Sequence, residues 1–195
     1  MKYISKNPGK LFEEDFKKSI PKDVYYLRLK DPAQSFNPNE ESKLRFSLKN
    51  PYDALLFKDI LMCLELKSTS QTSFSFETEA EYLKRKEDKK NKIQVKPNSK
   101  MIKYHQLLSL LETLKYKKII SGFIFNIRKE NNLDKTYFLY VKEFNKFMNE
   151  TTKVSINEKD IIQYGAIEVE GNLKRTRYQY NIEKMIEDII HKYTE

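Results

Sequence analysis

The chain has 195 residues and carries 37 Lys and Arg against 28 Asp and Glu, so its formal net charge is +9. Hydrophobic residues make up 39% and aromatic residues 13% of the chain, which excludes a disordered basic tail and indicates a folded protein. The positive charge indicates an anionic partner, either nucleic acid or a membrane surface. A single cysteine, Cys63, excludes a disulfide framework and a multi-cysteine zinc site. The first twenty residues have no apolar leader, and no stretch approaches the roughly 20 apolar residues of a membrane span. We therefore expect one cytoplasmic domain over residues 1–195. The acidic residues described below favour nucleic acid as the partner, and no membrane.

The first predicted elements are a helix and a strand. The helix starts at Asn7, which suits a cap, and Pro8, which suits a first turn, and it ends at Pro21. Residues 23–29 are rich in β-forming side chains and predict a strand. The next segment, 30–50, has two prolines and no sustained period. Its length predicts a functional loop or protrusion.

Two apolar strands, "PYDALLF" and "ILMCLELKS", follow on either side of Lys58 and Asp59 and predict a hairpin. Phe74 and Phe76 then alternate as core-facing strand residues do. Residues 81–103 hold nine basic and three acidic residues, which is +6 of the net charge. Two interpretations of this basic segment stay open, a solvated stretch and an arm that contacts DNA.

The second half predicts alternating helices and strands. Residues 101–116 form an amphipathic helix, with Ile102, Leu108, Leu111 and Leu114 among its apolar positions, and strands follow over 118–127, which include Phe123 and Phe125, and 136–141. A further helix has a capping box from Ser155 to Glu158 and ends near Gly165. Residues 166–195 predict a basic hairpin that turns at Gly171 and Asn172 and a last helix from Ile182. The order of elements indicates a mixed α/β domain.

Acidic residues around the central hairpin are the candidate site. Glu65 and Lys67 fall on one face of a strand, because side chains alternate along it. Asp53 on the partner strand can add a second carboxylate across the hairpin, and Glu13 on the first helix a third. Of the successive acids Glu13, Glu14 and Asp15, only one can point inward well. Converging carboxylates suit Mg²⁺ or Mn²⁺, and such a site suits hydrolysis of phosphodiesters, although a bare Glu-x-Lys triplet is more often a structural ion pair.

The motifs "NPGKLFEEDF", "KNPYDALLF", "CLELKST", "TSFSF" and "YHQLL" occur in the order found in RecU-like Holliday junction resolvases, and "KVSINEKDIIQYG" resembles the segment after their last core strands. From about Asn7 to Tyr164, the chain thus resembles this family of the PD-(D/E)xK nuclease superfamily. The resemblance implies a restriction-endonuclease-like core, with a mixed central sheet flanked by helices and a stalk between the first two core strands, where residues 30–50 lie. The bias towards Lys, Asn and Ile suits a phage or mobile-element member, hence bacterial or host cytoplasm.

The resemblance also implies site residues and an activity. The catalytic set is Glu13, Asp53, Glu65, Lys67 and Gln106, with Asp53, Glu65 and Glu13 as ligands of Mg²⁺ that Mn²⁺ can replace. The implied protein is a homodimer that resolves four-way DNA junctions by paired symmetric nicks during recombination and repair. Two departures stand out: the stalk-like segment is short, and the basic insertion at 79–100 is long.

Candidate DNA contacts follow from the positions of basic residues in these segments. They are Lys10, Arg28, Lys30, Lys43, Arg45, Lys84, Arg85, Lys86, Lys174, Arg175 and Arg177. Two alternatives stay open: a related nuclease that acts on duplex DNA or DNA ends, and a junction-binding protein with little catalysis.

Overall fold

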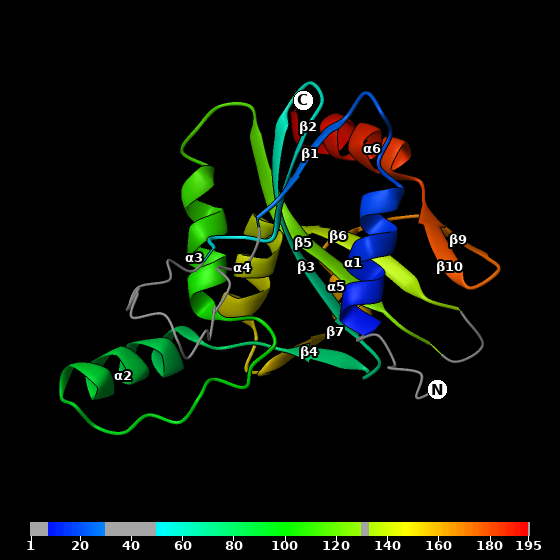
Figure 1. Cartoon of the computed structure of the whole chain (residues 1–195). Helices are drawn as coiled ribbons and strands as arrows, with labels where there is room; N and C mark the ends of the chain where they lie inside the picture. Colours follow the sequence, from blue (N-terminus) through cyan, green and yellow to red (C-terminus); the bar gives the residue numbers. More distant parts are fainter. Residues whose placement is uncertain (1–7, 30–49, 130–132, 195) are drawn as a thin grey trace, which may run out of the picture.

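The structure is a computed structural model that describes residues 8–29, 50–129 and 133–194. A six-stranded mixed sheet forms its centre, and six helices occur among the described residues (Figure 1). The mixed α/β class predicted from the sequence is confirmed. The elements are α1 (Pro8–Lys18), β1 (Tyr25–Arg28), β2 (Ala54–Phe57), β3 (Leu61–Thr69), β4 (Ser73–Ser75), α2 (Glu79–Lys90), α3 (Tyr104–Thr113), β5 (Ile119–Ile127), β6 (Lys135–Tyr140), α4 (Val141–Glu150), β7 (Ser155–Asn157), α5 (Glu158–Gln163), β8 (Ile167–Glu168), β9 (Gly171–Lys174), β10 (Arg177–Tyr180) and α6 (Ile182–Thr194).

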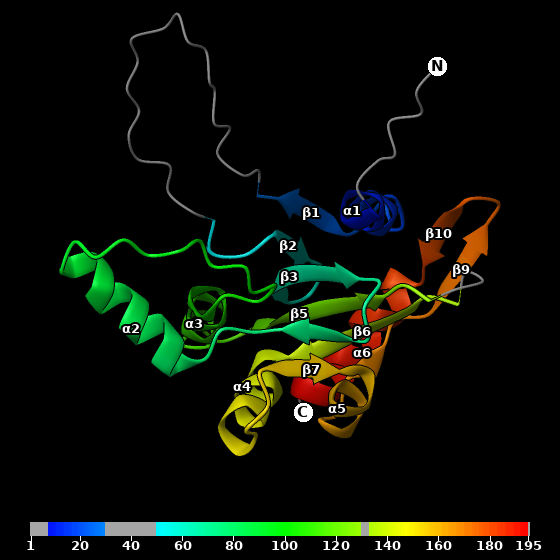
Figure 2. The ribbon, with the colours of Figure 1, turned by 90° about the horizontal axis from the view of Figure 1, so that it is seen from below.

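The central sheet has the strand order β1-β2-β3-β5-β6-β8 (Figure 2). Strands β3 and β5 are parallel and the other neighbours are antiparallel. The predicted hairpin is confirmed, with Ala54 opposite Leu64 and Phe57 opposite Leu61. The second strand of this hairpin, β3, lies inside the sheet between β2 and β5.

Each face of the sheet carries its own apolar core. Phe12 and Phe16 of α1 pack with Leu64 and Leu66 of β3 in one cluster, to which α6 also contributes. Cys63 of β3 belongs to the cluster on the other face, with α3, α4 and the small β4–β7 sheet. The alternation of β3 therefore places odd-numbered residues, which include Glu65 and Lys67, on the face that α3 covers.

The aromatic residues predicted as core are buried. Phe74, Phe123 and Phe125 are 0% exposed, and Phe76 is 1% exposed. The rings of Phe74 and Phe125 lie 4.7 Å apart between centroids, as do those of Phe123 and Phe144. These rings fix the β4–β7 layer against the sheet.

Several predicted details are wrong. Leu108 is 40% exposed, whereas Leu107 and Leu110 face the core. The last hairpin turns at Arg175 and Thr176, since Lys174 pairs with Arg177. Gly171 begins β9, where a Cβ atom would lie 2.9 Å from the ring of Tyr180, so this glycine permits close packing of the hairpin.

The capping box of α5 consists of Asn157 and Asp160, because Ser155 is used in β7, where it pairs with Ser75. Gly165 does end this helix, with φ +75°. Helices α2 and α4 were not predicted. The signal for α2 was a capping box of Thr78 and Glu81 at the start of the basic segment. None of the helices among the described residues is long and apolar enough to cross a membrane.

Candidate functional site

The site begins at Asp53, which directly precedes β2. Its backbone NH donates to the carbonyl of Leu64 at 3.0 Å. Its carboxylate Oδ2 accepts from the backbone NH of Leu66 at 2.8 Å. These two bonds tie Asp53 across the hairpin to β3 on both sides of Glu65, which brings the two carboxylates of the expected pair together.

Glu65 is the buried centre of the site. Its side chain is 1% exposed, and its Oε1 accepts from Nζ of Lys67 at 2.7 Å. Lys67 itself is 16% exposed, so its ammonium reaches the surface beside the carboxylate. The predicted common face of these two residues on β3 is confirmed.

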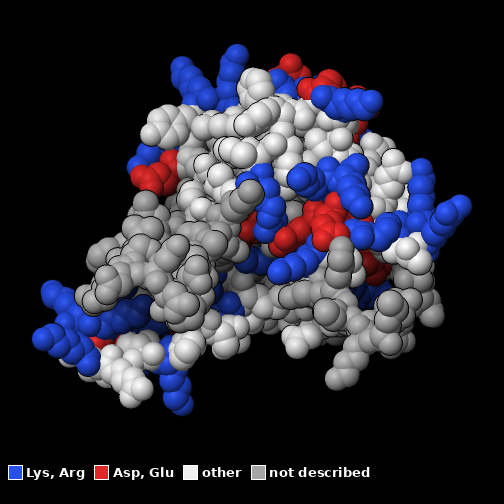
Figure 3. Space-filling view, viewed as in Figure 1, with Lys and Arg blue, Asp and Glu red and all other residues white. Residues whose placement is uncertain are grey.

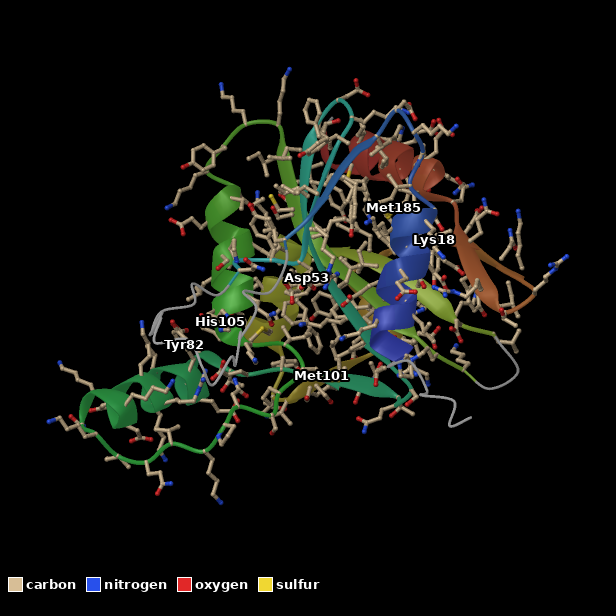
Figure 4. The ribbon with its side chains drawn as sticks, viewed as in Figure 1. Lys18, Asp53, Tyr82, Met101, His105 and Met185 are labelled. Carbon is tan, nitrogen blue, oxygen red and sulfur yellow. The ribbon has the colours of Figure 1, made fainter. Side chains whose placement is uncertain are left out.

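Gln106 reaches the same carboxylate from α3. Its amide Nε2 donates to Oε1 of Glu65. Its Oε1 accepts from the backbone NH of Lys103 at 2.9 Å, so both ends of the amide are engaged. The first turn of α3 therefore orients the carboxyl group of Glu65. Figure 4 shows Asp53 near the middle of the view and His105, the neighbour of Gln106, next to it on α3.

Burial raises the pKa of Glu65 from its ordinary value of 4.5 to about 7. Lys67 opposes this rise through its positive charge, whereas Asp53 adds to it as a like charge. A carboxylate that is both desolvated and next to a second carboxylate is costly to ionise. Two cationic side chains act on this pair of acids, Lys67 on Glu65 and Arg28 on Asp53.

Glu13 is linked to the pair through Arg28, which interacts electrostatically with both Glu13 and Asp53. Its carboxylate pairs with the guanidinium of Arg28 at 2.9 Å, and both side chains stay more than a quarter exposed. Of the three successive acids in α1, Asp15 is the buried one, at 6% exposed. Asp15 accepts from Nε of Arg177 at 2.5 Å and from the backbone NH of Tyr178 at 3.2 Å. The inward acid of α1 therefore holds the β9–β10 hairpin.

These positions decide which metal site the donors fit. Among the described residues there is no group of three or more His, Cys, Asp and Glu side chains that could hold a metal ion. The pair of Asp53 and Glu65 fits a divalent cation, because its hard oxygen donors carry two negative charges that a cation would offset. The candidate ligands are therefore these two carboxylates, and the carboxylate of Glu13 is paired with Arg28.

The predicted DNA contacts fall into three groups. Exposed side chains belong to Lys10, Lys84, Lys86, Lys174 and Arg175. Other predicted contacts are engaged in ion pairs: Arg28 with Glu13, Arg85 with Glu77, and Arg177 with Asp15 and Glu14. Lys30, Lys43 and Arg45 lie outside the described residues, as does most of the segment 30–50.

The space-filling view shows acidic side chains in the middle of one face (Figure 3). Lys and Arg side chains gather on either side of them, over α2 at one end and over the β9–β10 hairpin at the other. Basic side chains therefore flank the acidic ones on this face.

Glu77 is a structural anchor that the sequence analysis missed. Its side chain is 2% exposed, pairs with Arg85, and accepts from the backbone NH of Tyr104 at 3.0 Å. It joins α2 to the first turn of α3, two residues before Gln106. An acidic residue directly after the alternating "TSFSF" strand was the available signal.

Comparison with known proteins places the chain in a family. No protein-family model matches it. The SPbeta prophage-derived uncharacterized protein YotM of Bacillus subtilis (strain 168) is 30% identical over 199 residues, which covers 95% of this chain and 88% of that protein. The prophage source of this relative agrees with the expected phage or mobile-element character. The chain therefore belongs to the same family as the prophage-derived protein YotM.

Proposed function

We propose that this protein is a Mg²⁺-dependent DNA endonuclease of the PD-(D/E)xK type that resolves four-way junctions. The observation that supports the proposal is the convergence of Asp53, Glu65, Lys67 and Gln106. Glu65 and Gln106 are 41 residues apart in the chain and meet through a direct hydrogen bond. Two carboxylates, one ammonium and one amide in a single half-buried place are the groups that metal-assisted hydrolysis of a phosphodiester requires.

Each residue has a distinct part in the proposed reaction. Asp53 and Glu65 would hold the cation, which when bound supplies a Lewis acid that polarises water and phosphate. Lys67 would place positive charge against the phosphate oxygens as negative charge develops on them. Gln106 would keep the Glu65 carboxyl oriented. In the reaction, a water oxygen forms the new bond to phosphorus and gives up a proton, one P–O ester bond breaks, and the leaving oxygen takes up a proton and departs as an alcohol.

The choice of a junction as substrate rests on the resemblance to RecU-like resolvases. The ordered motifs from Asn7 to Tyr164 carry the resemblance, and Asp53, Glu65, Lys67 and Gln106 belong to three of them. In this proposal, the protein acts as a homodimer with two sites that nick opposite strands, residues 30–50 enter the junction, and Mn²⁺ can replace Mg²⁺. The net charge of +9 per chain suits a branched polyanion.

The proposal is tested on a synthetic four-way junction with each strand end-labelled in turn. Wild-type protein in Mg²⁺ is expected to produce paired nicks at symmetric positions. Asp53→Asn is expected to lower the cleavage rate at least 100-fold, on the order of the loss when a group that stabilises the transition state is removed. It should leave junction affinity within a few-fold, because the amide oxygen of Asn can still accept from the NH of Leu66.

The result also separates the alternatives. Equal cutting of linear duplex, or progressive loss from a labelled end, would indicate a related nuclease with another substrate. Tight and selective junction binding without cleavage in Mg²⁺ or Mn²⁺ would indicate a binding protein. If the protein neither binds junctions selectively nor cleaves any of these substrates, the proposal as a whole is refuted.

A further inference from the structure

Helix α2 is anchored at two points although none of its residues is buried. Its start is closed by a capping box, in which Thr78 and Glu81 exchange side-chain and backbone hydrogen bonds. Its middle is fixed by Arg85, which pairs with the buried Glu77. A helix without an apolar face that is nevertheless anchored at two points needs a reason other than core packing.

The anchors connect α2 to the candidate site through aromatic contacts. The ring centroids of Tyr82 and Tyr104 lie 5.3 Å apart, and Tyr104 is the first residue of α3. The ammonium of Lys86 lies 5.1 Å from the centroid of the Tyr82 ring. A short chain of contacts therefore runs from Lys86 through the two tyrosines to the turn of α3 that carries Gln106. In Figure 4, Tyr82, His105 and Asp53 follow one another across the view.

Three of the four lysines of α2 fall on one side of the helix, and Lys84 falls on the other. At 100° per residue, Lys86, Lys89 and Lys90 fall within about 80° of Tyr82, and Arg85 is turned towards Glu77. All three lysines are exposed. The acids Glu81 and Asp88 fall on the opposite flank, where Glu81 pairs with Lys100 at 3.3 Å. Glu79 falls at about 60° from Tyr82, on the side of the lysines, where it contacts Tyr104. The helix thus presents three lysines and one acid next to the tyrosines.

We propose that residues 78–100, here called the α2 arm, bind the phosphate backbone of duplex DNA through Lys86, Lys89 and Lys90. This inference rests on the proposed function, which places a scissile phosphate at Glu65. Lysine ammoniums are mobile point charges that suit phosphates along a backbone without reading its sequence. Arg85, which was expected to contact DNA, instead fixes the direction of the arm. The structure therefore separates the residues that hold the arm from those that bind the ligand.

Binding is measured by fluorescence anisotropy with a labelled 20-base-pair duplex and a fixed four-way junction, in EDTA, between 50 and 200 mM KCl. The test variant is K86Q/K89Q/K90Q. The control variant, K22Q/K142Q/K159Q, removes the same charge from exposed lysines outside α2. Loss of three phosphate contacts makes the slope of log affinity against log salt shallower by roughly 2.7. Across this salt range, the affinity advantage of the wild type over the test variant should shrink roughly 40-fold.

The outcomes separate this inference from the proposed function. Loss of slope in the test variant but not in the control supports the arm, even if no cleavage occurs and the nuclease assignment fails. Equal slopes for wild type and test variant overturn the arm, even if the wild type cuts junctions. The arm is also overturned if the test variant loses binding to anionic phosphatidylglycerol vesicles while its DNA binding is unchanged. It is overturned as well if the wild type does not bind DNA. Far-UV circular dichroism and melting should be unchanged, because α2 buries no residue.

Discussion

Replacing Glu65 with Gln should stabilise the metal-free protein at alkaline pH. Glutamine has the shape of the protonated carboxyl group and can keep hydrogen bonds of the same kind, but it carries no charge to desolvate. The native pKa of Glu65 is raised to about 7 from 4.5, chiefly by burial. At 1.36 kcal/mol per pKa unit, ionisation of Glu65 costs the folded state up to about 3 kcal/mol. E65Q removes this cost.

The sign of the pH dependence follows from proton binding. Because the pKa is higher in the folded than in the unfolded protein, the folded state binds more protons between pH 4.5 and 7. The free energy of unfolding that depends on Glu65 therefore falls as pH rises through this window. The penalty is absent below pH 4.5 and complete above pH 7. Wild type and E65Q should be about equally stable at pH 4.5, and E65Q more stable at pH 8.

The assay is urea denaturation in EDTA at pH 4.5, 6 and 8, with the difference between wild type and E65Q taken at each pH so that other titrating groups cancel. Adding Mg²⁺ at pH 8 should stabilise the wild type, by about 2.7 kcal/mol at 100 times its dissociation constant, and leave E65Q almost unchanged. A difference that stays constant over pH would refute the argument from burial. Equal stabilisation of both proteins by Mg²⁺ would refute the assignment of Glu65 as a ligand.

Two further predictions concern the frame around the site. Asp15→Ala leaves Arg177 and the NH of Tyr178 without their buried acceptor, which should cost about 1–3 kcal/mol of unfolding free energy and raise amide hydrogen exchange at β10. Unchanged exchange at β10 would show that Asp15 does not hold the hairpin. The control is Lys17→Ala, on the exposed side of α1. Gly122→Ala places a Cβ 2.5 Å from the carbonyl oxygen of Leu139 and 2.6 Å from the ring of Phe138. The free energy of unfolding from urea denaturation should therefore fall by about 1–3 kcal/mol. A stability equal to that of the wild type would mean that β5 and β6 can move apart at little cost.

The sequence by itself determined the features that depend on local geometry. The alternation of β3 places Glu65 and Lys67 on one face, and the short connection at Lys58 and Asp59 fixes the antiparallel register with β2. Alternating phenylalanines identified the buried strands, because apolar side chains at a period of two must face one side of a sheet. These elements needed no knowledge of residues far away in the chain.

The tertiary structure alone decided which distant groups meet. Glu13 and Asp15 are two residues apart on α1, yet Glu13 pairs with Arg28 and Asp15 with Arg177. Residue spacing cannot distinguish these outcomes, because they depend on how β1 and the β9–β10 hairpin pack beside the helix. The α2 helix shows the same limit. The sequence of this charged segment does not show whether it is anchored to the fold, and the tertiary structure shows that Arg85 pairs with the buried Glu77. Local periodicity fixes the face on which a side chain lies, and packing fixes the partner that it finds there.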